Sequence, residues 1–292
     1  MSQTTLTRRE LVKGSAALLA GCATLGPVQA LALPKSRVVL VRDREVFDSS
    51  GQLRGAVLAR MLDQAAARLF GTDPARAWRR VVGPKDTVGI KSNAWAHLPT
   101  PAVLEQQIRE RVLAAGVAKG RVAVDDRGVL RNPVFQRATA LINVRPLRTH
   151  HWSGVGSLIK NYIMFVPDPP RYHPDSCADL GAIWRLPLVA GKTRLCILVM
   201  LSPLFYGVGP HHYDPQYVWR YSGLLVGTDP VAVDTVGLRI LLAKRRQHFG
   251  EERRTRPPPK HIAIAGERHR LGVSDPSRIE IVRLGWSEGT LI

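Results

Sequence analysis

Residues 140–144, Ala140-Leu141-Ile142-Asn143-Val144, form an apolar run that predicts a buried β-strand. The run is followed at once by Arg145-Pro146-Leu147-Arg148-Thr149-His150-His151, in which cations and imidazoles become frequent. Ligands of an open α/β sheet lie beyond the carboxyl ends of its strands. This stretch therefore indicates both a strand of such a sheet and a place where polar side chains gather at its end.

The sequence before this strand alternates between further strands and helices. Helix formers fill residues 57–70, and a second helical segment, residues 102–115, is preceded by Pro101 and followed by Gly116. Short apolar runs around these segments predict three more strands, at residues 38–41, 86–91 and 121–125. Alternation of this kind is typical of parallel strands with covering helices.

The second half of the chain is less regular. Residues 167–170 read Pro-Asp-Pro-Pro and force a turn, and residues 253–259 end in three prolines and predict an exposed loop. We expect a strand at residues 195–200, a helix at 231–242 and a final strand at 279–282. Residues 33–292 are therefore predicted to form a single α/β domain with a mainly parallel sheet, covering helices and an irregular second half.

Composition limits the class of protein and its cofactors. The 292 residues are 45% hydrophobic and 22% charged, as in globular proteins and unlike collagen, coiled coils or disordered chains. The 3 cysteines, Cys22, Cys177 and Cys196, include no C-x-x-C pair. A zinc ribbon, a thioredoxin motif and an intrinsic iron–sulfur cluster need several thiolates at close spacing, so none of them is expected. The sequence leaves any other cofactor unknown.

Residues 1–32 are predicted to be a twin-arginine signal peptide. Arg8 and Arg9 precede an apolar, small-residue run from Gly14 to Leu25. This run is too short to cross the ~30 Å hydrocarbon core of a bilayer as a helix. We therefore expect the twin-arginine translocase as a partner and a periplasmic or extracytoplasmic location.

Two processing routes are compatible with this segment. Leu19-Ala20-Gly21-Cys22 resembles the box of a lipoprotein, in which a lipidated Cys22 would anchor the protein to a membrane. Ala30-Leu31-Ala32 instead supplies the small-x-small pattern for ordinary cleavage and release. In either case Cys177 and Cys196 remain in an oxidising compartment, where they could pair if the fold brings them together.

Positive charge is the unusual feature of the composition. Lys and Arg number 42 against 23 Asp and Glu, which gives a formal net charge of +19. Such an excess attracts nucleic acid, a phospholipid surface or an anionic small molecule, although solvated arginines of a generally basic protein would give the same count. Nucleic acid is the least expected, because an exported protein meets little DNA and 6% aromatic residues provide no stacking platform.

Polar side chains recur at the predicted strand ends and suggest an anion site. Lysine and arginine donate hydrogen bonds to carboxylates and phosphates, and the turn Gly154-Val155-Gly156-Ser157 would let backbone N–H groups approach the same anion. Histidine titrates in a range that suits proton transfer near neutral pH. We predict ligand binding by Lys91, Asn93, Arg148 and Asn161, and catalysis by His150, Lys160 and Asp234.

Metal binding is a second interpretation of the same sheet edge. The candidate ligands are Asp125 and His211, with Asp126 or Asp214 completing the shell. His150 and His151 are adjacent, and neighbouring residues on a strand point to opposite faces, so at most one of them would face a single site.

The sharpest local pattern is Asp229-Pro230-Val231-Ala232-Val233-Asp234. Asp229 is predicted to cap a helix that has proline at its first position. Asp234 is not needed for that cap. We expect it to pair with Lys91, Lys160 or Arg148 across the site, because an uncompensated buried charge is costly.

Four stretches in this order resemble the domain-of-unknown-function family 362: Ile90-Lys91-Ser92-Asn93, residues 142–150, Leu158-Ile159-Lys160-Asn161 and residues 229–234. In that family they usually read I-K-P-N, a proline-containing K-x-K-T-H, L-K-N and D-P-V-A-x-D. The resemblance runs over residues 37–282. It implies an α/β architecture and a site at these residues, but no particular reaction.

The chain departs from the family pattern at several positions. Ser92 stands where proline is usual, Arg148 replaces lysine, and Met200 falls where an acidic residue typically ends the strand. Some family members carry cysteine-rich iron–sulfur segments, which this sequence lacks. The loss of the acidic residue removes a candidate metal ligand or proton acceptor.

Two functions follow as expectations. The first is an exported protein of unknown reaction, an enzyme that binds an anionic small molecule or cofactor at the strand ends. The alternative is a non-catalytic, basic envelope protein that binds anionic lipid or polymer through distributed arginines. Salt would weaken the second kind of binding much more steeply than the first.

Overall fold

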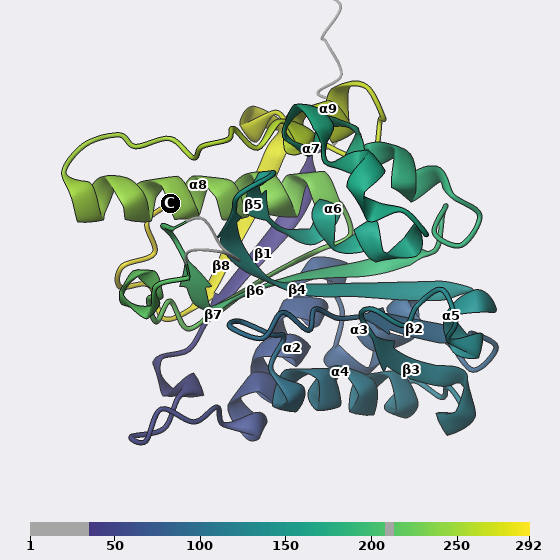
Figure 1. The fold of residues 1–292 in the computed structure, drawn as a ribbon. Coiled ribbons are helices and arrows are strands. Elements are labelled where there is room, and N and C mark those ends of the chain that lie inside the picture. Colours follow the sequence, from purple (N-terminus) through teal and green to yellow (C-terminus); the bar gives the residue numbers. More distant parts are fainter. Residues whose placement is uncertain (1–34, 208–212) are drawn as a thin grey trace, which may run out of the picture. The chain divides into compact units, whose positions relative to one another are not determined.

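A mixed β-sheet runs through the part of the chain that the computed structural model describes, residues 35–207 and 213–292 (Figure 1). Its eight strands are β1 (Ser36–Arg42), β2 (Val88–Lys91), β3 (Val122–Asp125), β4 (Ala140–His150), β5 (Gly154–Gly156), β6 (Thr193–Leu204), β7 (Gly223–Gly227) and β8 (Ile279–Gly285). The order across the sheet is β3-β2-β4-β6-β7-β1-β8, and β5 pairs with the end of β4.

Most neighbouring strands are parallel. β2 is parallel to β3 and β4, β4 is parallel to β6, and β1 is parallel to β8. β7 is antiparallel to both β6 and β1, and β5 is antiparallel to β4. The carboxyl ends of β3, β2, β4 and β6 consequently meet at one edge of the sheet.

Helices cover both faces of the sheet (Figure 1). One face carries α2 (Gly55–Phe70), α3 (Pro74–Val81) and α4 (Ala102–Ala114), and the other carries α6 (Leu158–Asn161), α8 (Pro230–Phe249) and α9 (Lys260–Glu267). Two more short helices are α5 (Pro133–Gln136) and α7 (Pro174–Cys177). The 3-10 helices are Arg44–Val46, Lys119–Arg121, Tyr162–Phe165, Pro169–Tyr172, Ala178–Arg185, Pro215–Tyr217 and Pro276–Arg278.

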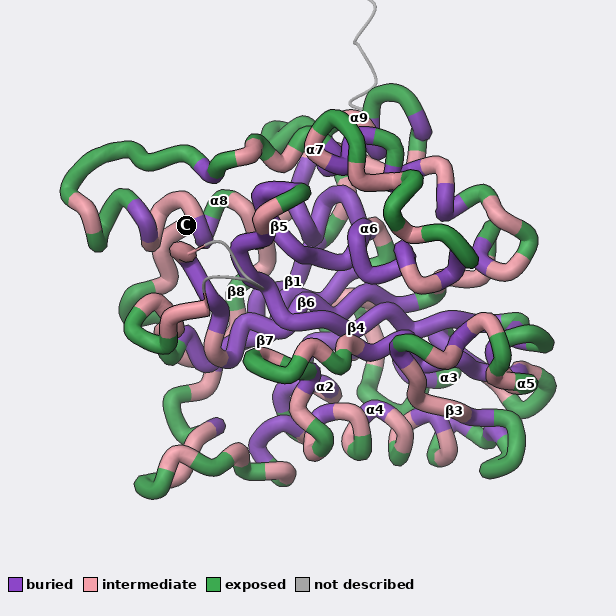
Figure 2. The backbone as a smooth tube through the Cα atoms, in the orientation of Figure 1, coloured by how far each residue is buried: buried purple, intermediate pink, exposed green. Residues whose placement is uncertain are grey.

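Each face of the sheet has its own hydrophobic core. Alternation along β4 sends Ile142 and Val144 into the core beneath α2, α3 and α4, and Leu141 and Leu147 into the core beneath α6, α8 and α9. Figure 2 shows the buried backbone concentrated in the strands, with exposed residues on the outer sides of the helices and in loops. A strand covered on both faces must be apolar on both, which explains the continuous apolar run at residues 140–144.

The predicted fold class is confirmed, and two details of it are corrected. Residues 145–150 were expected to follow the fourth strand, but they belong to it, since β4 ends at His150. β1 was expected among the first parallel strands, and it lies between β7 and β8 instead, far from β2. Sequence order does not determine strand order in a sheet whose strands are joined by long crossover connections.

Several predictions concern residues outside the described part of the chain. The twin-arginine signal, the lipoprotein box at Cys22 and the candidate ligand His211 all lie there. Among the described helices, none has both the length and the apolar character to cross a membrane.

Candidate functional site

The site lies where β4 extends beyond the end of the neighbouring strand β2. β2 pairs with β4 only from Val88 opposite Ala140 to Lys91 opposite Asn143. The rest of β4, including Arg145, Arg148 and His150, extends beyond the end of β2. Pro146 has no backbone N–H, and it is compatible with this overhang because β2 no longer offers a partner there. The overhang places charged strand residues beside the loops that follow β2 and β3.

A pocket of about 280 Å³ lies at this overhang. It combines cationic, imidazole and indole side chains from β4, α6 and four loops. Its lining residues are Asn93, Trp95, Asp126, Arg127, Arg145, Arg148, His150, Trp152, Lys160, Asn161, Ile163, Met164, Pro169 and His173. Of the seven residues predicted for the site, Asn93, Arg148, His150, Lys160 and Asn161 line this one pocket, and Lys91 and Asp234 lie behind it.

Lys91 and Asn161 form the polar support beneath the pocket. Lys91 Nζ is fully buried and donates to Asp126 Oδ1 at 2.5 Å, to the Ser92 carbonyl at 2.7 Å and to Asn161 Oδ1 at 3.3 Å. The Asn161 amide donates in turn to Asn143 Oδ1 at 2.8 Å. Burial lowers the pKa of Lys91 to about 8 against the opposing effect of Asp126. Lys91 therefore has its anion within the protein and does not need a ligand.

Arg145 and Arg148 are buried cations without such an anion. Nε of Arg145, and Nε and Nη1 of Arg148, have no hydrogen-bond partner among the described residues. The Arg148 guanidinium stacks on Trp95, with Cζ 4.0 Å from the ring centroid. Burial lowers the pKa of Arg145 to about 10, and burial together with the charge of Arg145 lowers that of Arg148 well below its ordinary value. The charges of Asp126 and Asp234 oppose the shift of Arg145, and that of Asp126 opposes the shift of Arg148, but the cost of burial outweighs them.

Lys160 adds a third buried nitrogen. It lies on α6, and its Nζ donates to Cys177 Sγ at 3.5 Å. Burial lowers the pKa of Lys160 to about 8, and the nearby charges of Arg145 and Arg148 lower it further against the effect of Cys177. Cys177 itself remains a thiol, because burial raises its pKa. Lys160 can thus exist as ammonium or as amine near neutral pH.

His150 is held as a neutral imidazole. Burial lowers its pKa below the ordinary value, and the charges of Lys160 and Arg148 act in the same direction. Its Nδ1 accepts a hydrogen bond from the Trp152 backbone N–H at 3.2 Å, so Nε2 carries the proton. The neutral ring can donate a hydrogen bond to a ligand, while transfer of a full proton from an imidazolium is disfavoured.

Asp234 does not pair with a cation as expected. Its carboxylate accepts hydrogen bonds from Ser157 Oγ at 2.6 Å and from the backbone N–H groups of Leu158 and Ile159, each at 2.9 Å. Burial raises its pKa to about 6 against these bonds. Asp234 therefore fixes the start of α6, the short helix that carries Lys160 and Asn161. Asp229 caps α8 as predicted, accepting from the N–H groups of Val231 and Ala232.

The metal interpretation gains nothing from the described residues. Asp125 accepts from the Gly128 N–H at 2.8 Å and from Asn132 Nδ2 at 3.0 Å, which closes the loop after β3. No group of three or more metal-ligating side chains occurs in the described ranges. Cys177 and Cys196, which the sequence allowed to form a disulfide, are both buried free thiols.

Sequence reasoning did not select several residues of the pocket. Arg145 was quoted but not chosen, because its place in the middle of β4 was unknown. Trp95 and Trp152 belong to loops that follow strand ends, and Trp152 is the one large hydrophobic side chain found exposed in the described chain, at 45%. Trp152 stacks on His173 with centroids 3.8 Å apart. The available signal in the sequence was position: Trp95 follows Lys91 by four residues, and Trp152 directly follows His151, so each indole lies close in sequence to a predicted polar cluster.

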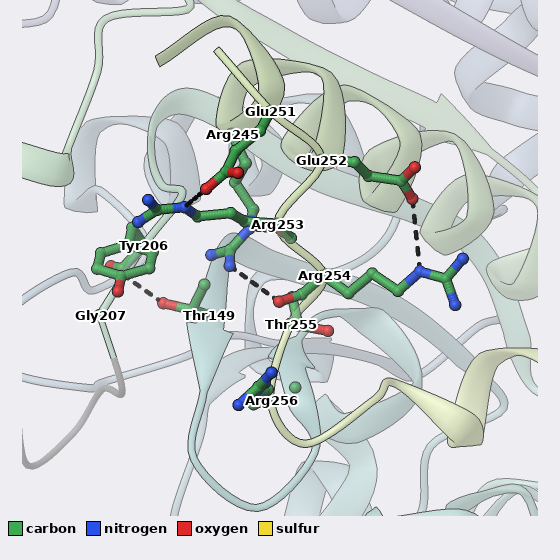
Figure 3. Close-up of a pocket in the computed structure, with 11 residues that line it drawn as sticks. Thr149, Tyr206, Gly207, Arg245, Glu251, Glu252, Arg253, Arg254, Thr255 and Arg256 are labelled. Carbon is green, nitrogen blue, oxygen red and sulfur yellow. Dashed lines mark hydrogen bonds and ion pairs between the residues drawn. The ribbon is translucent and has the colours of Figure 1, made fainter. Parts of the chain in front are cut away.

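A larger hollow of about 700 Å³ lies near the end of α8 (Figure 3). Three of its four arginines already have partners, and the fourth, Arg256, is exposed. Arg245 donates to the carbonyls of Phe205, Arg253 and Arg254. Figure 3 shows Arg253 paired with Glu251 and Arg254 with Glu252. The smaller pocket is the better candidate for an anion, since its buried cations are unpaired.

Lys160 makes stability depend on pH in a predictable direction. Its pKa is 10.5 in the reference state and about 8 in the folded protein, so the unfolded chain binds more protons between these values. The free energy of unfolding contributed by Lys160 therefore rises with pH over this range, by up to about 3 kcal/mol. Urea denaturation of wild type and Lys160→Met at pH 7.5 and 9.5 measures it. The variant should be the more stable at pH 7.5 by a margin that shrinks at pH 9.5, and a constant margin would contradict the prediction.

Comparison with known proteins gives one family match. The model of a family described as a domain of unknown function (DUF362) matches residues 132–239. The match contains residues 142–150, 158–161 and 229–234, and it supports the resemblance there, whereas residues 90–93 lie outside it. No curated protein and no solved structure was found to match the chain.

Proposed function

We propose that the pocket at the end of β4 binds a small anion, and that the protein is an enzyme acting on a molecule that carries this anionic group. The observation that supports the proposal most is the pair of buried guanidinium groups of Arg145 and Arg148, in which Nε of both residues and Nη1 of Arg148 lack partners. Leaving a buried charge unpaired is strongly unfavourable. A bound carboxylate or phosphate would remove that cost and could accept from Arg148 through two nitrogens.

The balance of charge within the pocket supports the same conclusion. Arg145, Arg148 and Lys160 contribute cations, and the one carboxylate in the lining, Asp126, is already bonded to Lys91. Burial raises the pKa of Asp126, but the neighbouring charge and hydrogen bond of Lys91 outweigh it and keep the pKa below its usual range. Asp126 therefore stays ionised and remains paired with Lys91.

The proposal also includes the export route and the cofactor expectation that the sequence predicts. We propose export through the twin-arginine translocase to a periplasmic or extracytoplasmic place, with or without lipidation of Cys22. No intrinsic iron–sulfur cluster is expected, and any other cofactor is open. Mass spectrometry and metal analysis of protein purified from its own export route would identify a co-purifying anion, flavin or metal.

Thermal unfolding in inorganic phosphate tests the binding proposal. A ligand that binds only the folded state raises the melting temperature, and the rise grows with the ratio of free ligand concentration to Kd. We expect phosphate to stabilise the wild type at constant ionic strength and Lys160→Ala to lose most of this stabilisation while retaining the fold. Lys119→Ala, which removes an exposed lysine, is the matched control. Equal stabilisation of all three proteins would remove Lys160 from the site.

Salt separates the proposal from its alternative, a basic envelope protein that adheres to anionic lipid or polymer. Exposed charge pairs are screened when the Debye length falls from about 10 Å at 0.1 M salt to about 3 Å at 1 M. Binding of phosphate in the buried pocket should survive added sodium chloride much better than adhesion to anionic vesicles does. Vesicle adhesion that resists salt, with no phosphate binding, would favour the alternative.

A further inference from the structure

The two lysines of the site are in different chemical situations. Lys91 is held by Asp126 and does not line the pocket. Lys160 lines the pocket, and its hydrogen bond among the described residues goes to a thiol sulfur. A lysine that is desolvated beside other cations is the type that serves as a nucleophile.

The groups that face Lys160 leave its ammonium form without an anionic partner. β4 contributes Arg145, Arg148 and the neutral His150, and α7 contributes the thiol of Cys177. His261 on α9 and His173 also face it, and burial together with the charge of Lys160 lowers their pKa values to about 3 and about 4. Every titratable neighbour is thus cationic or neutral near pH 8.

The carboxylate-binding cations and the amine share one small volume. Arg145 and Arg148 line the same pocket of about 280 Å³ as Lys160. This volume is at the lower end of ligand pockets, which favours a molecule of a few carbon atoms. A ligand whose carboxylate is held by the arginines would have its adjacent carbon near the amine.

We propose that Lys160 condenses with the carbonyl group of a small 2-oxo carboxylate to form an imine, an inference that rests on the anion site proposed above. The Nζ lone pair attacks the carbonyl carbon, and the carbonyl oxygen takes up a proton to become the hydroxyl group of a carbinolamine. Loss of this hydroxyl as water, with the second amine proton released, leaves the C=N bond. No oxidant or reductant is needed for the condensation.

His150 lines the same pocket as Lys160 and can assist this step. Its Nδ1 is occupied by the Trp152 N–H, so the available Nε2–H can donate a hydrogen bond to the oxygen of the carbinolamine. The ring stays neutral and therefore does not add a further positive charge beside Lys160.

Reductive trapping tests the inference. Full-length protein is incubated at pH 8 with glyoxylate and sodium cyanoborohydride, and the modified lysines are identified by peptide mass spectrometry. We expect Lys160 to be modified more than about tenfold faster than the exposed Lys119, because a larger fraction of Lys160 is the free amine. Inorganic phosphate should slow the reaction at Lys160 alone.

Three controls distinguish carboxylate-dependent reaction at Lys160 from general lysine reactivity. Propionaldehyde lacks a carboxylate and therefore cannot be held by the arginines, so its preference for Lys160 should be much smaller than that of glyoxylate and should come from the free-amine fraction alone. Lys119→Arg should leave the rate at Lys160 unchanged, and Arg148→Met should lower it. Glyoxylate labelling no faster at Lys160 than at Lys119, in protein that still binds phosphate, would overturn the imine and leave the anion site standing. Loss of phosphate binding as well would overturn the proposed function itself.

Discussion

Replacing Arg148 with methionine is expected to weaken the binding of inorganic phosphate by about 100-fold or more. The substitution removes two unpaired nitrogens, Nε and Nη1, that would donate to the anion. A hydrogen bond between charged groups contributes about 1.5–3 kcal/mol, so losing two of them exceeds a factor of 100. Methionine retains an apolar contact with Trp95. Isothermal titration calorimetry with phosphate at constant ionic strength measures the change.

The same variant should be at least as stable as the wild type when no ligand is present. It removes a buried positive charge whose burial and repulsion by Arg145 outweigh the attraction of Asp126, and such a charge opposes folding. Arg254→Met is the matched control, because Arg254 is exposed and paired with Glu252. Phosphate affinity should be unchanged in this control. A destabilised Arg148→Met that binds phosphate normally would assign Arg148 a purely structural role.

Asp234→Ala is expected to lower the free energy of unfolding by about 3–5 kcal/mol. Its carboxylate accepts from Ser157 Oγ and from two backbone N–H groups, all of them buried. Alanine leaves these donors unsatisfied at the start of α6. Urea denaturation at pH 7.5 measures the loss.

Ser157→Ala provides the graded control for Asp234. It removes one of the three hydrogen bonds and leaves both backbone donors satisfied, so we expect a loss of about 1 kcal/mol. Because α6 carries Lys160, Asp234→Ala should also weaken phosphate binding. A loss for Asp234→Ala as small as that for Ser157→Ala would contradict the role assigned to the carboxylate.

The fold class could be predicted because its signals are local. Apolar runs such as residues 140–144 identify strands, and caps such as Asp229 identify helix starts. The order of strands could not be predicted, because pairing of β1 with β7 and β8 joins segments that are far apart in the sequence. The length of β4 was missed because Pro146 and charged residues usually mark a strand end, and only the early end of β2 makes the overhang possible.

The site was predicted as a set of residues, but their roles depend on contacts that sequence does not reveal. Lys91 and Lys160 look alike in sequence, yet one is bonded to Asp126 and the other faces the pocket. Asp234 was expected to neutralise a cation, and it binds backbone N–H groups instead. Arg145 was passed over because its significance lies in its burial without a partner, which requires the three-dimensional structure.

The most direct measurement is a crystal structure of the protein grown with inorganic phosphate. We expect a phosphate ion in the pocket at the end of β4, within hydrogen-bond distance of Arg148 and close to Lys160, with Lys91 still bonded to Asp126. This expectation would be contradicted by guanidinium groups of Arg145 and Arg148 that turn to bulk water or bond to protein carboxylates, with phosphate found at surface arginines alone.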